Sequence, residues 1–170
     1  EKTVKCHAHK EDDLLYLIEL KQRYGIRFTA EHTCDVHHAE IYDRLAEEGI
    51  PVIYGPLGSL DYKVELKNAS YRHTRVIMDS KATFGLMTDH PVILSSALRD
   101  SLKYFLIAGM SATEAINLIT RRNAEILGID DELGTVEPGK LASLVVWDGD
   151  PLTLGAFPTA VFAEGRKIRG

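Results

Sequence analysis

The 170-residue chain contains little sulfur, with two cysteines and three methionines. Two cysteines cannot form the set of disulfide bonds that holds small secreted scaffolds together, and neither belongs to a Cys-x-x-Cys pair. We therefore expect Cys6 and Cys34 to be reduced thiols of a cytoplasmic protein. A structural zinc site built from these cysteines and nearby histidines stays open at this point, although the close ligand spacing of such sites is missing.

The sequence also lacks a run of basic residues and an apolar stretch long enough to cross a bilayer. Its formal net charge is −5, and its first residues show no signal-peptide pattern. We therefore expect no nucleic-acid partner and no membrane partner. No glycine-rich loop follows any of the predicted strands, which argues against an open flavodoxin-like sheet that binds phosphate.

What the sequence does contain is a regular alternation of strand-like and helix-like segments. Apolar runs predict strands, and amphipathic segments between them predict helices. Because this unit recurs about every 25 residues, we expect βα repeats whose strands form a parallel sheet. The predicted strands are 4–8, 26–31, 51–55 and 84–88, and the predicted helices between them are 11–25, 37–49 and about 68–82.

The second part of the chain changes in character. Two further helices are predicted at 95–108 and from Ser111 to Gly128, the latter beginning with a capping box of Ser111 and Glu114. The remainder is rich in turns, with strands predicted at 141–147 and near the end. The expected domains are therefore residues 1–128 and a small β appendage at 129–170.

Polar side chains occupy the ends of three predicted strands: His7, His32 and Asp89. The carboxyl ends of parallel strands meet at one edge of a sheet, where α/β proteins bind ligands. Two imidazoles and a carboxylate are ligands that Zn²⁺ or a similar divalent ion accepts. Any one of these residues alone is ordinary at a strand end, so the prediction depends on their recurrence at successive strands.

The other histidines fit simpler explanations. His37, His38 and His73 lie on segments predicted to be helical, and we interpret them as parts of solvated faces. Arg72 and His73 could also contact a substrate, but the solvated face is favoured. His90 lies between Asp89 and a proline, where it either contacts a substrate or shapes the turn.

Four runs, VKCHAH, RFTAEH, GLMTDHP and GTVEPGKLASLVVWDGDPL, occur in an order and spacing that resemble the C-terminal half of an amidohydrolase-superfamily enzyme. The similarity is to the imidazolonepropionase and prolidase-like branch. It implies an α/β fold: the C-terminal half of a TIM-type (β/α)8 barrel, strands 5–8 with their helices, plus part of a small β-sandwich. It also implies His7, His32 and Asp89 as metal ligands, with His9 and His90 as substrate-binding residues.

The resemblance implies a chemistry as well. In the complete enzyme, one or two zinc or other divalent ions would activate water to hydrolyse a carbon–nitrogen bond. The substrate would be a small molecule: a cyclic amide, an N-acyl amino acid or a dipeptide. Asp89 and His32 would be catalytic, Asp89 moving the proton and His32 binding a second ion or orienting the attacking hydroxide.

The family's earlier His-x-His pair and its bridging Lys or Glu have no counterpart in this sequence. We therefore expect a fragment, inactive alone, that forms a homo-oligomer or joins a complementing N-terminal half through open sheet edges. The alternative is an inactive α/β domain that functions only by assembling with a partner chain.

Overall fold

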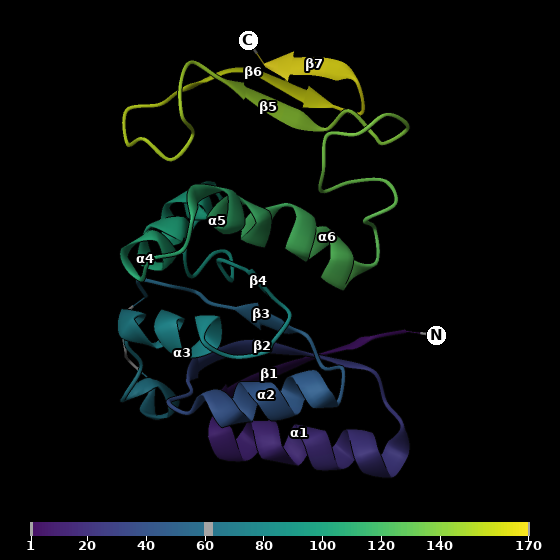
Figure 1. Cartoon of the computed structure of the whole chain (residues 1–170), viewed down its shortest axis with the longest axis vertical. Helices are drawn as coiled ribbons and strands as arrows, with labels where there is room; N and C mark the ends of the chain where they lie inside the picture. Colours follow the sequence, from purple (N-terminus) through teal and green to yellow (C-terminus); the bar gives the residue numbers. More distant parts are fainter. Residues whose placement is uncertain (1, 60–62, 170) are drawn as a thin grey trace.

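The fold is described by a computed structural model that covers residues 2–59 and 63–169. Four parallel strands form the main sheet in the order of the sequence, and helices connect them (Figure 1). This arrangement confirms the predicted α/β fold with a parallel sheet. The strands are β1 (Val4–Lys10), β2 (Phe28–Asp35), β3 (Val52–Tyr54) and β4 (Phe84–Leu86), and the first connecting helices are α1 (Glu11–Tyr24), α2 (Ala39–Glu47) and α3 (Thr74–Met78).

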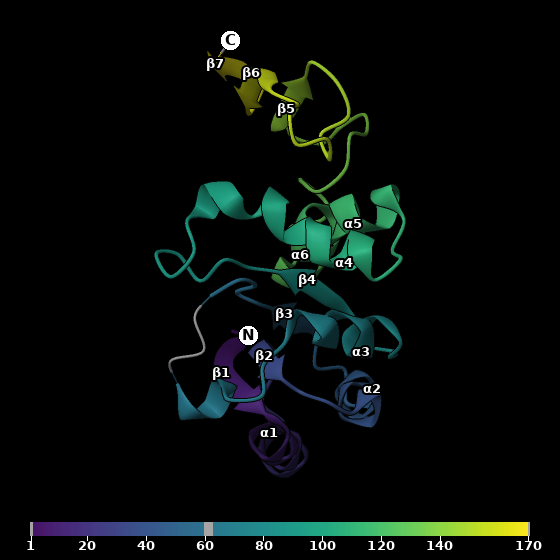
Figure 2. The same cartoon turned by 90° about the vertical axis from the view of Figure 1, so that its left-hand side faces the viewer.

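Helices pack against this sheet and against one another. Helix α1 contacts β1 and β2, and contacts between neighbouring helices continue from α1 through α2 and α3 to the later helices (Figure 2). Burying one large apolar side chain completely contributes about 1.5–3 kcal/mol, so this core fixes the strands relative to one another. Its fully buried side chains include Leu14, Ile18, Tyr42, Leu45, Val52, Tyr54, Ile77, Leu102 and Phe105.

Several predicted elements have different bounds in the structure. Strand β1 continues to Lys10, so His9 lies inside the strand rather than beyond it. The helix predicted at about 68–82 was wrong in length: Ser70 accepts a hydrogen bond from the backbone N–H of Arg72 and starts a separate 3-10 turn. This segment contains η1 (Val64–Leu66), η2 (Tyr71–His73) and only then α3.

The later helices are also more divided than predicted. The expected helix at 95–108 begins as two 3-10 turns, and the one after Ser111 breaks at Thr120, whose φ of −124° and ψ of −92° are not helical. The capping box of Ser111 and Glu114 is confirmed. The elements are η3 (Ser95–Ala97), η4 (Arg99–Ser101), α4 (Leu102–Ile107), α5 (Ala112–Ile119) and α6 (Arg121–Leu127).

A second, antiparallel sheet follows the helices. Its strands are β5 (Leu144–Trp147), β6 (Pro158–Ala163) and β7 (Arg166–Arg169), and it stands on the far side of α4–α6 from the main sheet (Figure 1). None of the residues from 129 to 169 is buried. Among the described helices, none has the length and apolar character needed to cross a membrane.

Candidate metal centre

Three histidines from the first two strands meet at the carboxyl-terminal edge of the main sheet. His7 and His9 are two residues apart on β1 and so share a face of the sheet. His32 lies on β2 as the register partner of Ala8. The ring centroids are 4.0 Å apart for His7 and His32, and 4.8 Å apart for each of the other two pairs. One ring nitrogen from each histidine lies within 4.8 Å of the others.

The backbone of β2 changes conformation where His32 enters this group. Ala30 lies in the core, and strict alternation would place the side chain two residues later on the same face. Instead, His32 and Thr33 have φ values of +80° and +55°. Such values are uncommon for residues other than glycine, and for a β-branched residue such as Thr33 they are a genuine exception. The ring of His32 therefore lies with His7 and His9.

The hydrogen bond of His32 determines which of its nitrogens can bind a metal. Its Nδ1 lies 2.9 Å from the carbonyl oxygen of Gly55. A carbonyl oxygen only accepts, so Nδ1 carries the hydrogen and Nε2 keeps a lone pair. Burial lowers the pKa of His32, and the nearby charge of His7 lowers it further. The ring is therefore neutral at neutral pH, as a metal ligand must be.

His9 is the most buried member of the group, with 2 % of its surface exposed. Its Nδ1 is buried and has no hydrogen-bond partner within the described residues. Burial lowers the pKa of His9 to about 4, and the charges of His32 and His7 contribute to the shift. A buried neutral imidazole with an unused nitrogen is costly to keep without a partner, and a metal ion supplies one.

Two charged residues that sequence reasoning missed lie over the histidines. Glu65 Oε1 is 3.5 Å from Nε2 of His7 and 3.8 Å from Nε2 of His9, and Lys63 Nζ is 3.4 Å from the same oxygen. Glu65 belongs to the 3-10 turn η1, which packs on β1 and β2. Such a short turn has no periodic pattern by which the sequence could have placed it.

Asp89 lies next to the three histidines but is not a member of their group with metal-ligand spacing. It follows β4 with a φ of +51°, and its charge raises the pKa of His32, opposing the effect of burial. Asp89 shares with His9 and His32 a cavity of about 20 Å³, enough room for one water-sized group. The other residues lining this cavity are Cys34, Pro56, Ser59, Lys63, Leu66 and Val92.

The remaining candidate residues lie elsewhere. His90 is exposed, does not line this cavity, and its Nδ1 accepts a hydrogen bond from the backbone N–H of Ser95 at 3.3 Å. Neither Cys6 nor Cys34 belongs to the group with metal-ligand spacing found in the described part of the chain. The cysteine-containing zinc site considered from the sequence therefore has no support in the geometry.

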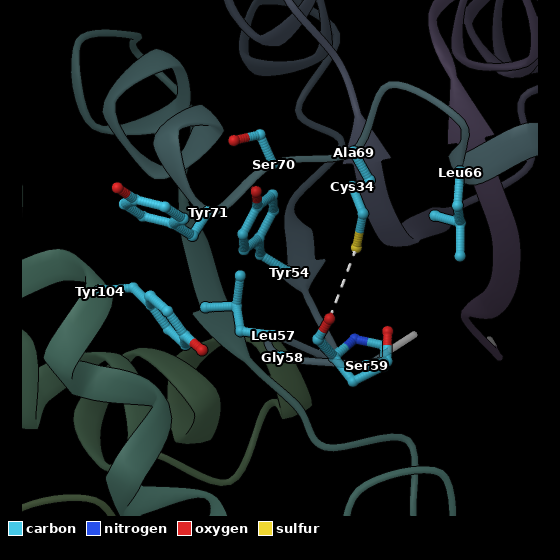
Figure 3. A pocket seen from close by; sticks show the side chains of 11 residues that line it. Cys34, Tyr54, Leu57, Gly58, Ser59, Leu66, Ala69, Ser70, Tyr71 and Tyr104 are labelled. Atoms are coloured by element: carbon cyan, nitrogen blue, oxygen red, sulfur yellow. Dashed lines mark hydrogen bonds between the residues drawn. The ribbon is translucent and has the colours of Figure 1, made fainter. Parts of the chain in front are cut away.

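A larger pocket of about 270 Å³ adjoins the small cavity and shares four residues with it: Cys34, Pro56, Ser59 and Leu66 (Figure 3). Tyr71 and Tyr104, with ring centroids 5.8 Å apart, form one side, and Leu66 lies across from them. The described residues that line the pocket are all uncharged. The pocket therefore suits an uncharged group next to the three histidines.

Comparisons with known proteins agree with this geometry. The sequence model of the amidohydrolase family matches residues 2–169. The chain is 43% identical, over 159 residues, to an imidazolonepropionase from Sphingopyxis alaskensis; the match covers 89% of this chain and 37% of that protein. The chain thus spans well under half the length of this relative.

Solved structures give the same result. An amidohydrolase from Thermotoga maritima superimposes with a TM-score of 0.89 and 32% identity, covering 96% of this chain and 42% of that one. A Xaa-Pro dipeptidase with bound methionine superimposes with a TM-score of 0.76 and 22% identity, covering 99% of this chain and 45% of that one. The resemblance noted in the sequence is confirmed, and the chain belongs to the amidohydrolase family.

Proposed function

We propose that this chain is the metal-binding C-terminal half of a hydrolase that cleaves carbon–nitrogen bonds in small amides with activated water. One observation carries the proposal: in a member of the amidohydrolase family, three imidazoles converge, and the most buried of them, His9, has an Nδ1 without a hydrogen-bond partner among the described residues. The three ligands would be His7, His9 and His32. This set differs from the one implied by resemblance, because His9 takes a ligand position and Asp89 moves to the cavity wall.

The donor set fits zinc, which accepts three protein nitrogens and keeps a fourth position for water or substrate. When bound, the ion polarises a carbonyl oxygen and makes water nucleophilic near neutral pH. Gly55 holds the tautomer of His32 that presents Nε2. His7 is the most exposed of the three ligands, and Glu65, whose Oε1 lies 3.5 Å from Nε2 of His7, can orient its ring.

Asp89 is the residue that we assign to proton transfer. A carboxylate in a cavity with room for one water-sized group can take the proton of the attacking water and deliver it to the leaving nitrogen. His32 lies in the same cavity and would orient that water. The uncharged pocket beside them would hold the group next to the scissile bond, as in a cyclic amide, an N-acyl amino acid or a dipeptide.

The architecture supports a half-barrel that is completed by other residues. The main sheet ends at β1 on one side and at β4 on the other. In the family, strands of this kind are strands 5–8 of a (β/α)8 barrel, and the small sheet is part of a β-sandwich. We propose that a complementing N-terminal half, or a second copy, completes both.

A second candidate function is assembly alone, without catalysis. It is favoured by a groove of about 770 Å³ between the helices α4–α6 and the small sheet, lined mainly by apolar side chains. Leu127, Val145 and Leu141 are among its residues, and each is more than a third exposed. An apolar groove of this size is typical of a surface that another chain covers.

Elemental analysis after exhaustive dialysis tests the proposal. We expect His9→Ala to bind about one zinc ion fewer per chain than the wild type, and the matched control His90→Ala, whose histidine lies outside the cavity, to bind as much zinc as the wild type. Circular dichroism would establish that both variants fold. A metal-free wild type, or a His9→Ala variant that binds as much zinc as the wild type, would favour assembly without catalysis.

A further inference from the structure

A second group of polar residues lies at the end of β2, away from the three-histidine site. Three contacts link its four residues in series: Asp35 to His37, His37 to His73, and His73 to the backbone carbonyl of Cys34. Asp35 ends β2, His37 lies in the loop that follows, and His73 ends the 3-10 turn η2. Two of the three histidines interpreted from the sequence as parts of solvated faces, His37 and His73, therefore contact each other.

The distances between these polar groups are short enough that the position of each hydrogen matters. His37 Nε2 is 2.9 Å from Asp35 Oδ1, His37 Nδ1 is 3.2 Å from His73 Nε2, and His73 Nδ1 is 3.3 Å from the carbonyl oxygen of Cys34. Asp35 is buried, so its Oδ1 has little access to water, and Nε2 of His37 is the group 2.9 Å from it. A hydrogen on Nε2 of His37 therefore stabilises this carboxylate.

The two neutral rings of His37 and His73 have too few hydrogens to satisfy all of their contacts. The carbonyl of Cys34 only accepts, so His73 carries its hydrogen on Nδ1, and the carboxylate of Asp35 likewise favours a hydrogen on Nε2 of His37. A neutral imidazole carries a single ring hydrogen. Both remaining nitrogens, Nδ1 of His37 and Nε2 of His73, then present lone pairs to each other at 3.2 Å. Two acceptors at that distance repel unless a cation lies between them.

The arrangement matches a metal site in two respects. Two nitrogen ligands of a tetrahedral zinc ion, each about 2.0–2.1 Å from the metal, lie about 3.3 Å apart, close to the separation found here. Histidine ligands also typically donate their other ring hydrogen to a carboxylate or a backbone carbonyl, as Asp35 and Cys34 accept here. The rings are nearly perpendicular, at 88°, with centroids 4.5 Å apart.

We propose that His37 and His73 form a second metal site, for an imidazole-binding ion such as Zn²⁺, with Asp35 and the Cys34 carbonyl fixing the two rings. The side chain of His37 is 36% exposed, so water can complete the coordination. The ion joins the end of β2 to the segment that carries Ser70 and Tyr71, which line the uncharged pocket. Its role is to hold that wall of the pocket in place.

Nitrogen-15 NMR of the histidine rings in the wild-type chain, with and without Zn²⁺, tests this site directly. We expect Zn²⁺ to shift Nδ1 of His37 and Nε2 of His73, while Nε2 of His37 and Nδ1 of His73 stay protonated. If Zn²⁺ leaves these four resonances unchanged, or if His37 is doubly protonated at saturating Zn²⁺, the pair shares a proton and the proposal is wrong.

Zinc stoichiometry provides the second measurement. His37→Gln should bind about one ion fewer per chain than the wild type, whatever the three-histidine site binds. His38→Gln is the matched control, because His38 neighbours His37 but contacts Glu11 instead. Equal zinc stoichiometry in the wild type and both variants would overturn the proposal, and a loss in both variants would point to the fold rather than to this site.

Discussion

The parallel unit around β1–β4 and the small sheet β5–β7 differ in how much apolar surface they bury within this chain. The parallel unit contains a continuous core of side chains removed from water, from Leu14 on α1 to Phe105 on α4. The small sheet contains no buried residue, and Val145 and Val146 on its edge strand β5 are each 44% exposed. One region of the chain thus has its own hydrophobic core, and the other leaves its apolar side chains exposed to solvent.

This difference indicates where completion matters. Hydrophobic burial is the main favourable contribution to folding, so the parallel unit can hold the three histidines in place by itself. The small sheet borders the apolar groove beside α4–α6, where the proposed complementing half or second copy would pack. Metal binding and assembly are therefore expected to be separable properties of this chain.

Truncating a core residue should have the largest effect. Leu45 on α2 is fully buried, so Leu45→Ala should lower the free energy of unfolding by about 2–5 kcal/mol. Val145→Ala in the small sheet removes an exposed side chain and should cost less than about 1 kcal/mol. Urea denaturation followed by circular dichroism measures both, and equal losses would refute the distinction between the two regions.

A smaller effect is expected where the core supports the metal site. The hydroxyl of Tyr42 is 3.0 Å from the carbonyl oxygen of Thr33 and 3.1 Å from its Oγ1. Tyr42→Phe leaves these buried groups unpartnered, at a cost of about 1–3 kcal/mol. Because Thr33 holds the unusual backbone next to His32, zinc affinity should fall as well. Unchanged affinity by calorimetric titration would mean that the strand holds this conformation without Tyr42.

The sequence predicted the parts of this molecule that repeat. Alternating βα units and strand-end histidines were visible because each carries a periodic or positional signal. The face of the sheet on which the His32 side chain lies could not be derived from the sequence. Two consecutive residues with positive φ, His32 and Thr33, break the alternation of β2. Glu65 and the contact between His37 and His73 were also hidden, since both depend on short 3-10 turns that tertiary packing determines.

The contact between the two regions should be weak. The guanidinium of Arg99 lies 4.7 Å from the centre of the Trp147 ring, and its Nη1 donates to the carbonyl of Ala156 at 3.4 Å. Arg99→Ala should destabilise the small sheet by about 0.5–1 kcal/mol and leave the parallel unit intact. Trp147 is the single tryptophan, so its fluorescence reports the small sheet while circular dichroism reports the helices. Coincident shifts of both signals would mean that the regions unfold as one.

An effect of similar small size is expected at Glu11, which joins α1 to the loop before α2. Burial alone would raise the pKa of Glu11, but hydrogen bonds from the backbone N–H groups of His37 and His38 and from the His38 ring outweigh it and lower the pKa. Its stabilising contribution is therefore present above the ordinary value of 4.5 and is lost as pH falls through the lowered pKa. Glu11→Gln should cost about 0.5–1 kcal/mol at pH 7. The two proteins should converge in acid, and a difference that persists at low pH would exclude the carboxylate as its cause.

The most direct test of the account is a crystal structure of the zinc-soaked chain with anomalous diffraction at the zinc absorption edge. We predict a peak about 2.0–2.1 Å from one ring nitrogen each of His7, His9 and His32, with Asp89 facing it across the cavity. The absence of a peak there at saturating zinc would contradict the proposal that this half of the amidohydrolase fold holds the metal by itself.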